Sequence, residues 1–219
     1  MSALDIQTLA DGVSLRLPEG RGGLTLVPRL GTQLPRYHFR LGRVVHAAQE
    51  LGLFRVQQTL LLGNDHTGET ELTGLWLDET LDTAGREAAL AALVNGARAW
   101  IAEHRAACGD WLILELPGWR THEGRSPFWE ALGARFHPRD AIAAKARWGA
   151  AWCSHLAALL PRQTLYLSFL GDAAQQACGR TDAAHEQLLP ALHRLGFLPP
   201  LQVRIDDGGP VLSCPLPRD

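Results

Sequence analysis

Lysine is nearly absent from this sequence, and no charge of either sign is in marked excess. Lys145 is the only lysine, so arginine supplies nearly all of the 21 basic side chains, which face 23 acidic ones over 219 residues. The formal net charge is -2, with a pI near 6.5. Such a balance gives no general attraction to nucleic acid or to an anionic bilayer. We therefore expect neither a nucleic-acid partner nor a membrane partner.

Long apolar runs and metal-binding spacings are also missing. No stretch approaches the roughly 20 apolar residues of a membrane span. Residues 1–11 carry two acids and no basic segment, so no signal peptide is expected. There is no CxxC and no Cys/His zinc pattern, so we expect no metal site. Four scattered cysteines are typical of reduced thiols in a cytoplasmic protein: Cys108, Cys153, Cys178 and Cys214.

The first third of the chain predicts strands. Hydrophobic residues make up 46% and charged residues 20%, as in an ordinary globular protein. With no internal repeat and no low-complexity linker, a single domain over residues 1–219 is expected.

Gly74 lies in the middle of one predicted strand, where a glycine often marks a bulge. The strands are predicted over residues 12–17, 24–28, 37–47, 56–62 and 71–77.

Helices and strands alternate from about residue 70 onward. The clearest helix spans residues 85–106, with apolar residues at helical spacing and Asp82 or Thr83 as N-cap. The continuous apolar run at 111–116 indicates a strand covered on both faces. This alternation favours a mixed α/β sheet. The other helices are predicted at 127–132, 148–160 and 182–195, and the other strands at 164–170 and 201–205.

Several blocks carry a family likeness. Residues 64–78 contain Asn64-Asp-His-Thr-Gly68, Glu71-Leu72 and Leu75-Trp-Leu-Asp78. Residues 124–133 read Gly-Arg-Ser-Pro-Phe-Trp-Glu-Ala-Leu-Gly, and residues 205–210 read Ile-Asp-Asp-Gly-Gly-Pro. In order and spacing these blocks resemble the arginine N-succinyltransferase family, and the likeness covers about residues 34–212.

The resemblance implies a fold and an activity. The fold is α/β (α+β): a GNAT-like acyl-CoA N-acyltransferase with a mixed central sheet flanked by helices. The reaction is transfer of succinyl from succinyl-CoA to the α-amine of arginine or a related amino acid, with the CoA ester as co-substrate and no permanently bound cofactor. Family members are longer and begin with a strand and two helices that we do not expect here. A homo-oligomer, or a hetero-oligomer with a related acyltransferase subunit, would supply them.

The resemblance also assigns residues to CoA. The strand at 71–77 is expected to splay from its neighbour, so that backbone groups of Leu75, Trp76 and Leu77 contact the acyl-CoA. Gly85 and Arg86 fall in the loop that holds the pyrophosphate at the next helix N-terminus. Asp82 and Glu87 replace an arginine and a glycine of the family pattern, and these acids would repel phosphate unless Arg86 offsets them. The alternative is that this stretch only caps a helix.

The resemblance also points to catalytic residues. The family histidine that acts as general acid aligns with Asp182, and His185 lies one helical turn further on, where it could take over that role. The alternative is a capping Asp182 and a surface His185. Glu71, like Glu115, lies on a predicted buried strand, where an acid acts as a base, binds a cationic substrate, or pairs with an arginine. Two functions stay open: an acyltransferase, or a non-catalytic GNAT-like subunit or CoA-ester-binding partner of a full-length succinyltransferase.

Overall fold

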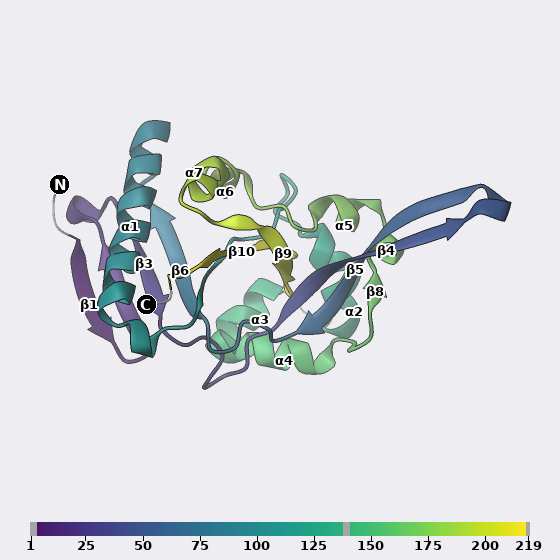
Figure 1. Cartoon of the computed structure of the whole chain (residues 1–219), viewed down its shortest axis with the longest axis horizontal. Coiled ribbons are helices and arrows are strands. Elements are labelled where there is room, and N and C mark those ends of the chain that lie inside the picture. Colours follow the sequence, from purple (N-terminus) through teal and green to yellow (C-terminus); the bar gives the residue numbers. More distant parts are fainter. Residues whose placement is uncertain (1–3, 138–140, 218–219) are drawn as a thin grey trace.

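Ten strands form one mixed sheet within residues 4–137 and 141–217, which the computed structural model describes (Figure 1). Their order is β1-β2-β3-β6-β7-β10-β9-β4-β5-β8, and every neighbouring pair is antiparallel except β6 and β7, which run parallel. The expected mixed sheet with flanking helices is confirmed. The strands are β1 (Asp5–Leu9), β2 (Gly12–Arg16), β3 (Gly22–Val27), β4 (His38–Ala48), β5 (Leu53–Gly63), β6 (Thr70–Leu77), β7 (Trp111–Glu115), β8 (Leu165–Tyr166), β9 (Leu198–Arg204) and β10 (Pro210–Pro215).

The longest helix, α1, connects the two parallel strands. A parallel pair needs such a crossover, because a tight turn cannot return the chain to the same end of the sheet. Asp82 caps α1, which begins two residues before the predicted start and ends three residues before the predicted end. The α-helices are α1 (Thr83–Glu103), α2 (Ala134–Phe136), α3 (Ala141–Trp148), α4 (Trp152–Leu159), α5 (Asp172–Ala177), α6 (Ala183–Glu186) and α7 (Leu189–Arg194), and a π-helical turn at Trp129–Gly133 leads into α2.

One hydrophobic core joins α1 to the sheet. Leu90, Leu93 and Ala97 recur at helical spacing and are fully buried against β2, β3, β6, β7 and β10. Leu192 of α7 closes the same core from the side. Burying each leucine contributes about 1.5–3 kcal/mol, so this packing fixes α1, and hence its N-terminus, beside β6.

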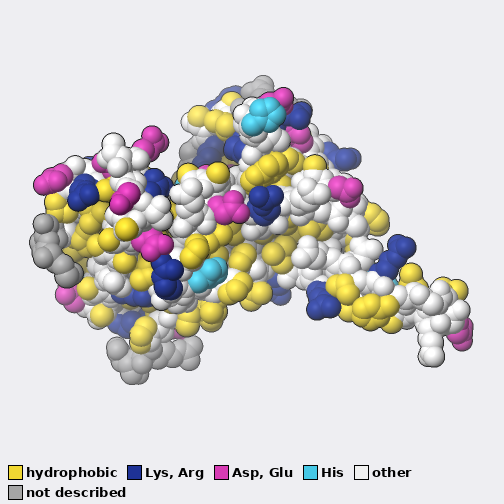
Figure 2. All heavy atoms as spheres, turned by 90° about the horizontal axis from the view of Figure 1, so that it is seen from above, with side chains coloured by type: hydrophobic (Ala, Val, Ile, Leu, Met, Phe, Trp, Pro, Cys, Tyr) yellow, Lys and Arg dark blue, Asp and Glu magenta, His cyan; other side chains and the backbone are white. Residues whose placement is uncertain are grey.

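A second core holds the other end of the sheet. Phe39, Leu60 and Leu62 of the β4–β5 hairpin are buried there together with the π-helical turn, α3 and α4. Beyond this core the hairpin projects from the body as an arm (Figure 1). Figure 2 shows hydrophobic side chains along this arm, where Phe54 is 69% exposed and Val45 is 48% exposed.

Three predicted elements were wrong in extent. The predicted strand 164–170 is a strand only at Leu165–Tyr166, because β5 pairs with it at two positions and the chain then turns into a 3-10 helix. The predicted helix 148–160 is α-helical only as α4, Trp152–Leu159, after a 3-10 turn at Gly149–Ala151. The helix α3 before it was not predicted, and Gly149, with a φ of 53°, separates the two helices. The predicted helix 182–195 is also interrupted.

Pro190 explains that last interruption. Proline lacks an N–H, and within a helix its ring clashes with the preceding turn, whereas it fits in a first turn. The chain therefore ends α6 at Glu186 and begins α7 at Leu189, with Pro190 in the first turn. Strands β1 and β10 were not predicted; Pro210 and Pro215 bracket β10 and obscure its short apolar run.

Candidate active site

The parallel strands β6 and β7 separate before β6 ends. Their ladder runs from Thr70↔Leu112 to Leu72↔Leu114, and within the described chain it goes no further. β6 nevertheless continues to Leu77 along β3. The edge of β6 that faces away from β3 is thus unpaired with β7 beyond Leu72. We call the space between residues 73–77 and the continuation of β7 the wedge.

Residues 180–182 line the wedge on its β7 side. The carbonyl of Pro117 accepts a hydrogen bond from the Asp182 N–H at 3.2 Å, while the Leu116 N–H donates to the Pro210 carbonyl in β10 at 3.0 Å. Successive residues of an extended chain direct their backbone groups to opposite edges. Since Leu116 faces β10, Pro117 faces the edge that β6 has left. Residues 180–182 therefore lie where β6 would have continued.

Asp182 and His185 form a hydrogen-bonded pair at this position. Asp182 caps α6: its Oδ1 accepts the His185 N–H at 2.9 Å, and the same oxygen lies 2.8 Å from His185 Nδ1. The His185 side chain is 21% exposed, so it is neither a free surface residue nor fully buried. A carboxylate on Nδ1 fixes the tautomer and leaves Nε2 to exchange a proton. The described residues place no partner on Nε2. Asp182 therefore both caps α6 and forms a carboxylate–imidazole pair with His185.

The N-terminus of α1 is closed by its own cap. Asp82 Oδ1 accepts the Gly85 N–H at 2.7 Å, and so occupies one of the donors that a phosphate would use. Glu87 was expected to repel a phosphate as well. Its carboxylate is instead paired with Arg194 of α7 at 2.5 Å. Arg86 Nε is buried and has no partner within the described chain. A hollow of about 460 Å³ opens beside these turns, with Gly85 in its lining.

Gly74 sets the direction of the three predicted CoA-contacting residues of β6. Its φ is 61°, and the pairing with β3 shifts register at this point. An L-residue rarely adopts that conformation, so glycine permits the bulge. The bulge resets the alternation: Leu75 and Leu77 both turn toward α1, while Trp76 is 45% exposed. All three lie in the segment that borders the wedge.

Glu71 and Glu115 point away from α1 into a buried cluster of charges. Leu72 and Leu114 belong to the α1 core, and neighbouring strand residues alternate faces. Arg36 joins the two acids, with Nε 2.8 Å from Glu115 and Nη2 3.2 Å from Glu71. The pairing of Glu71 with an arginine, one of the three roles considered from the sequence, is therefore present.

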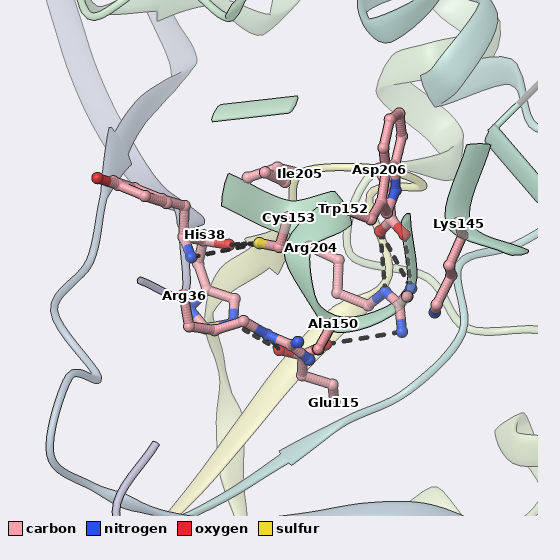
Figure 3. Close-up of a pocket in the computed structure, with 12 residues that line it drawn as sticks. Arg36, His38, Glu115, Lys145, Ala150, Trp152, Cys153, Arg204, Ile205 and Asp206 are labelled. Carbon is pink, nitrogen blue, oxygen red and sulfur yellow. Dashed lines mark hydrogen bonds and ion pairs between the residues drawn. The ribbon is translucent and has the colours of Figure 1, made fainter. Parts of the chain in front are cut away.

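The cluster extends across the sheet through Glu115 (Figure 3). His38 Nε2 lies 2.7 Å from Glu115 Oε1, and Arg204 Nη1 lies 3.6 Å from its other oxygen. Arg204 also pairs with Asp206 at 2.9 Å and with Asp207 at 3.0 Å. Strands β4, β7 and β9 thus each contribute a charged or titratable group.

The two glutamates of this cluster titrate differently. Burial, followed by repulsion from Glu115, raises the pKa of Glu71 to about 7, against the attraction of Arg36. Burial alone would also raise the pKa of Glu115, but Arg36, His38 and Arg204 together hold it well below its usual range. The cluster therefore keeps one permanent carboxylate and one that exchanges its proton near neutral pH.

The described residues form neither a metal-binding cluster nor a membrane-spanning helix. Over residues 4–137 and 141–217, no three His, Cys, Asp or Glu side chains converge as ligands of a metal ion would. In the same part of the chain, no helix combines the length and apolar character needed to cross a bilayer. All four cysteines are unpaired thiols.

Known proteins share both the sequence and the fold. The family model described as arginine N-succinyltransferase beta subunit matches residues 18–218. The chain belongs to the arginine N-succinyltransferase family. Arginine N-succinyltransferases of Escherichia coli (strain K12 / DH10B) and Escherichia fergusonii are each 35% identical over 193 residues, 86% of this chain and 54% of theirs. The chain thus spans about half the length of these curated relatives.

A solved structure of the family agrees with the fold. Arginine/ornithine succinyltransferase subunit AI from Pseudomonas aeruginosa has a TM-score of 0.71 and 25% identity, covering 95% of this chain and 62% of that chain. The resemblance seen in the sequence motifs and the GNAT-like fold are both confirmed.

Several charged residues around Glu115 were not predicted from the sequence. Arg36, His38 and Arg204 surround Glu115, but nothing in their local pattern marks them. The one available signal was Glu115 itself, since a buried acid requires a cationic partner. With some 20 arginines to choose from, the sequence could not say which one.

Proposed function

We propose that this chain transfers a succinyl group from succinyl-CoA to the α-amine of arginine or a related amino acid. Membership of the family supports the reaction class. The observation that carries the proposal for this chain is the Asp182–His185 pair at the wedge between β6 and β7. A proton-transfer group is thereby held at the point where the sheet opens.

The reaction needs two proton movements. The amine nitrogen attacks the thioester carbonyl, the C–N bond forms, the C–S bond breaks, and the amine proton must leave while the thiolate gains one. His185 Nε2 is the group we assign to this exchange. Asp182, 2.8 Å from Nδ1, stabilises the imidazolium as it forms. Glu71, which titrates near neutrality, is a second proton acceptor in this proposal.

The CoA ester would lie along β6. Backbone groups of Leu75, Trp76 and Leu77 border the wedge and are our candidates to polarise the thioester carbonyl, as backbone N–H groups do for developing oxyanions. The pyrophosphate would approach the start of α1 at Gly85 and Arg86. The unpartnered Nε of Arg86 and the neighbouring hollow support this placement.

The decisive experiment measures thiol release from succinyl-CoA with arginine as acceptor. We expect turnover above the protein-free blank. General acid–base groups contribute roughly 10²–10⁴-fold to the rate, and water can replace part of this, so His185→Ala should lower kcat at least tenfold. Asp182→Asn retains a good cap and should lower kcat while stability is unchanged. The matched control is His122→Ala, a 91% exposed histidine. A rate for His185→Ala equal to that of the parent would remove His185 from the mechanism.

One observation favours a second function, a non-catalytic CoA-ester-binding partner. Asp82 places a carboxylate on the helix N-terminus where the pyrophosphate should bind. Calorimetry separates the two functions: heat on mixing with succinyl-CoA but no thiol release would favour the partner, whereas release above the blank would favour the enzyme. The absence of heat at high micromolar ligand would reject both.

An oligomer with a second copy or a related acyltransferase subunit completes the proposal. The chain matches 54% of its relatives' length, and the solved relative is named as a subunit. The arm offers an exposed apolar face in Val45, Phe54 and Val56. Phe54→Arg should reduce the mass measured by light scattering; a monomeric parent would contradict the homo-oligomer.

We place the protein in the cytoplasm, to which the four unpaired thiols are suited.

A further inference from the structure

A small cavity lies inside the charge cluster, apart from the wedge. It measures about 40 Å³ and is lined by Arg36, His38, Glu115, Lys145, Trp152 and Asp206, among others (Figure 3). One water molecule needs roughly 10–15 Å³ of cavity volume. The cavity therefore has room for a group of about three heavy atoms.

Two residues that line the cavity each have a buried polar atom with no partner among the described residues. Trp152 is 4% exposed, and its Nε1 has no acceptor within the described chain. His38 is 3% exposed, and its Nδ1 likewise has no partner there, although Nε2 is held by Glu115. Leaving a buried polar atom unsatisfied costs about 1–3 kcal/mol. The cavity is therefore built to be completed by a polar group.

The charges that line the cavity favour an anion. Three cations border it, Arg36, Lys145 and Arg204, of which the two arginines are already paired with carboxylates. Arg36 uses Nε and Nη2 on its two glutamates, so Nη1 has no acceptor among the described residues. Lys145, at the exposed end, makes no ion pair within that part of the chain. Lys145 is therefore the cation that is left to balance one singly charged anion.

A second, open hollow leads from this cavity toward the wedge. It measures about 420 Å³, shares Lys145, Arg204 and Asp206 with the cavity, and reaches Pro117. The Pro117 carbonyl is the acceptor of the Asp182 N–H. A group seated in the cavity can therefore belong to a molecule whose other end lies near the Asp182–His185 pair.

We propose that this cavity is a subsite for a carboxylate group, held by Arg36 and Lys145 and by the indole N–H of Trp152. The size suits the three heavy atoms of a carboxylate, and the unpaired ammonium group of Lys145 suits a monoanion. Both the free carboxylate of a succinyl group and the α-carboxylate of an amino acid have this chemistry. Binding of a carboxylate does not depend on the proposed acyl transfer; its assignment to a substrate does.

The first test is a titration of the ¹⁵N-labelled full chain with sodium succinate at constant ionic strength. The indole resonance of Trp152, identified by its loss in Trp152→Phe, should shift saturably at about 1–20 mM, the range of weak single-carboxylate binding. Lys145→Gln should weaken this binding at least fivefold. Arg147→Gln is the matched control, since Arg147 lies on the same helix but stacks on Trp148. No saturable shift, or an equal loss in the control, overturns the subsite.

The second test identifies the source of the carboxylate. If it is the acyl carboxylate, Lys145→Gln raises KM for succinyl-CoA and leaves KM for butyryl-CoA unchanged. If it belongs to the acceptor, KM rises for arginine but not for agmatine, which lacks the α-carboxylate. If Lys145→Gln leaves the KM values of all four compounds unchanged, the carboxylate does not belong to a substrate. If no turnover is seen at all, the acyl-transfer proposal fails, while the succinate titration still decides the subsite.

Discussion

Replacing Glu71 by glutamine should stabilise the protein at neutral and alkaline pH. Glu71 has only a 5% exposed side chain, and burial with repulsion from Glu115 raises its pKa from 4.5 to about 7. Because the folded-state pKa exceeds the unfolded one, folding favours the protonated acid. The contribution of the protonated Glu71 to the free energy of unfolding is therefore complete below about pH 4.5, and it is lost as the pH rises through 7. A shift of this size corresponds to about 3 kcal/mol.

Glutamine imitates the protonated acid and keeps an oxygen for Arg36. At about pH 5 the parent and Glu71→Gln should differ little in free energy of unfolding. At about pH 8 the variant should be more stable by up to about 3 kcal/mol. Urea unfolding followed by tryptophan fluorescence at both pH values measures the difference.

Glu50→Gln provides the control, because Glu50 lies exposed in the turn of the arm. It should leave the pH dependence of the parent unchanged. A Glu71→Gln variant that loses the same stability at both pH values would refute the reasoning. It would mean that Glu71 is ionised throughout and that its pair with Arg36 is net favourable.

Three further predictions concern the helix cap, the bulge and the two cores. Asp82→Ala should lower the free energy of unfolding by about 1 kcal/mol, because the helix cap is lost. The same variant should bind CoA more tightly in calorimetry, because a charge of the same sign as the pyrophosphate is removed. Weaker binding would contradict the placement of the pyrophosphate. Gly74→Ala should cost about 1–2 kcal/mol in urea unfolding through backbone conformation alone, since no atom lies within 4 Å of the added Cβ; an unchanged midpoint would mean that the bulge relaxes. Phe39→Ala and Leu90→Ala, in the two cores, should each lower the Tm of one calorimetric transition, because one sheet joins the cores; two separately shifted transitions would argue against a single domain.

Local patterns predicted much of the sheet and the crossover helix. The strand around Gly74, the helix after Asp82 and the strand at 111–116 all appear within a few residues of their expected places. Each has a signal within its own residues: a buried apolar run, helical periodicity, or a cap. The family motifs added the order of these elements, which periodicity cannot supply.

Features that depend on distant partners could not be predicted. Residues 180–182 border the wedge through hydrogen bonds to Pro117 and Trp119, and Asp182 lies 65 positions from Pro117 in the sequence. The charge cluster needs Arg36 and Arg204 to meet at Glu115, and neither lies near it in sequence. The length of β8 was likewise decided by how much edge β5 offers, not by the apolar residues at 165–170.

The short parallel ladder between β6 and β7 has a mechanical consequence. Three residue pairs, from Thr70↔Leu112 to Leu72↔Leu114, are all the backbone pairing that the described chain provides between the β1-β2-β3-β6 sheet and the remaining six strands. The two parts of the sheet are thus joined by only a short ladder, next to the place where the acyl donor is expected. A thioester laid along that ladder would bridge both halves, so occupancy should slow amide hydrogen exchange on both sides at once.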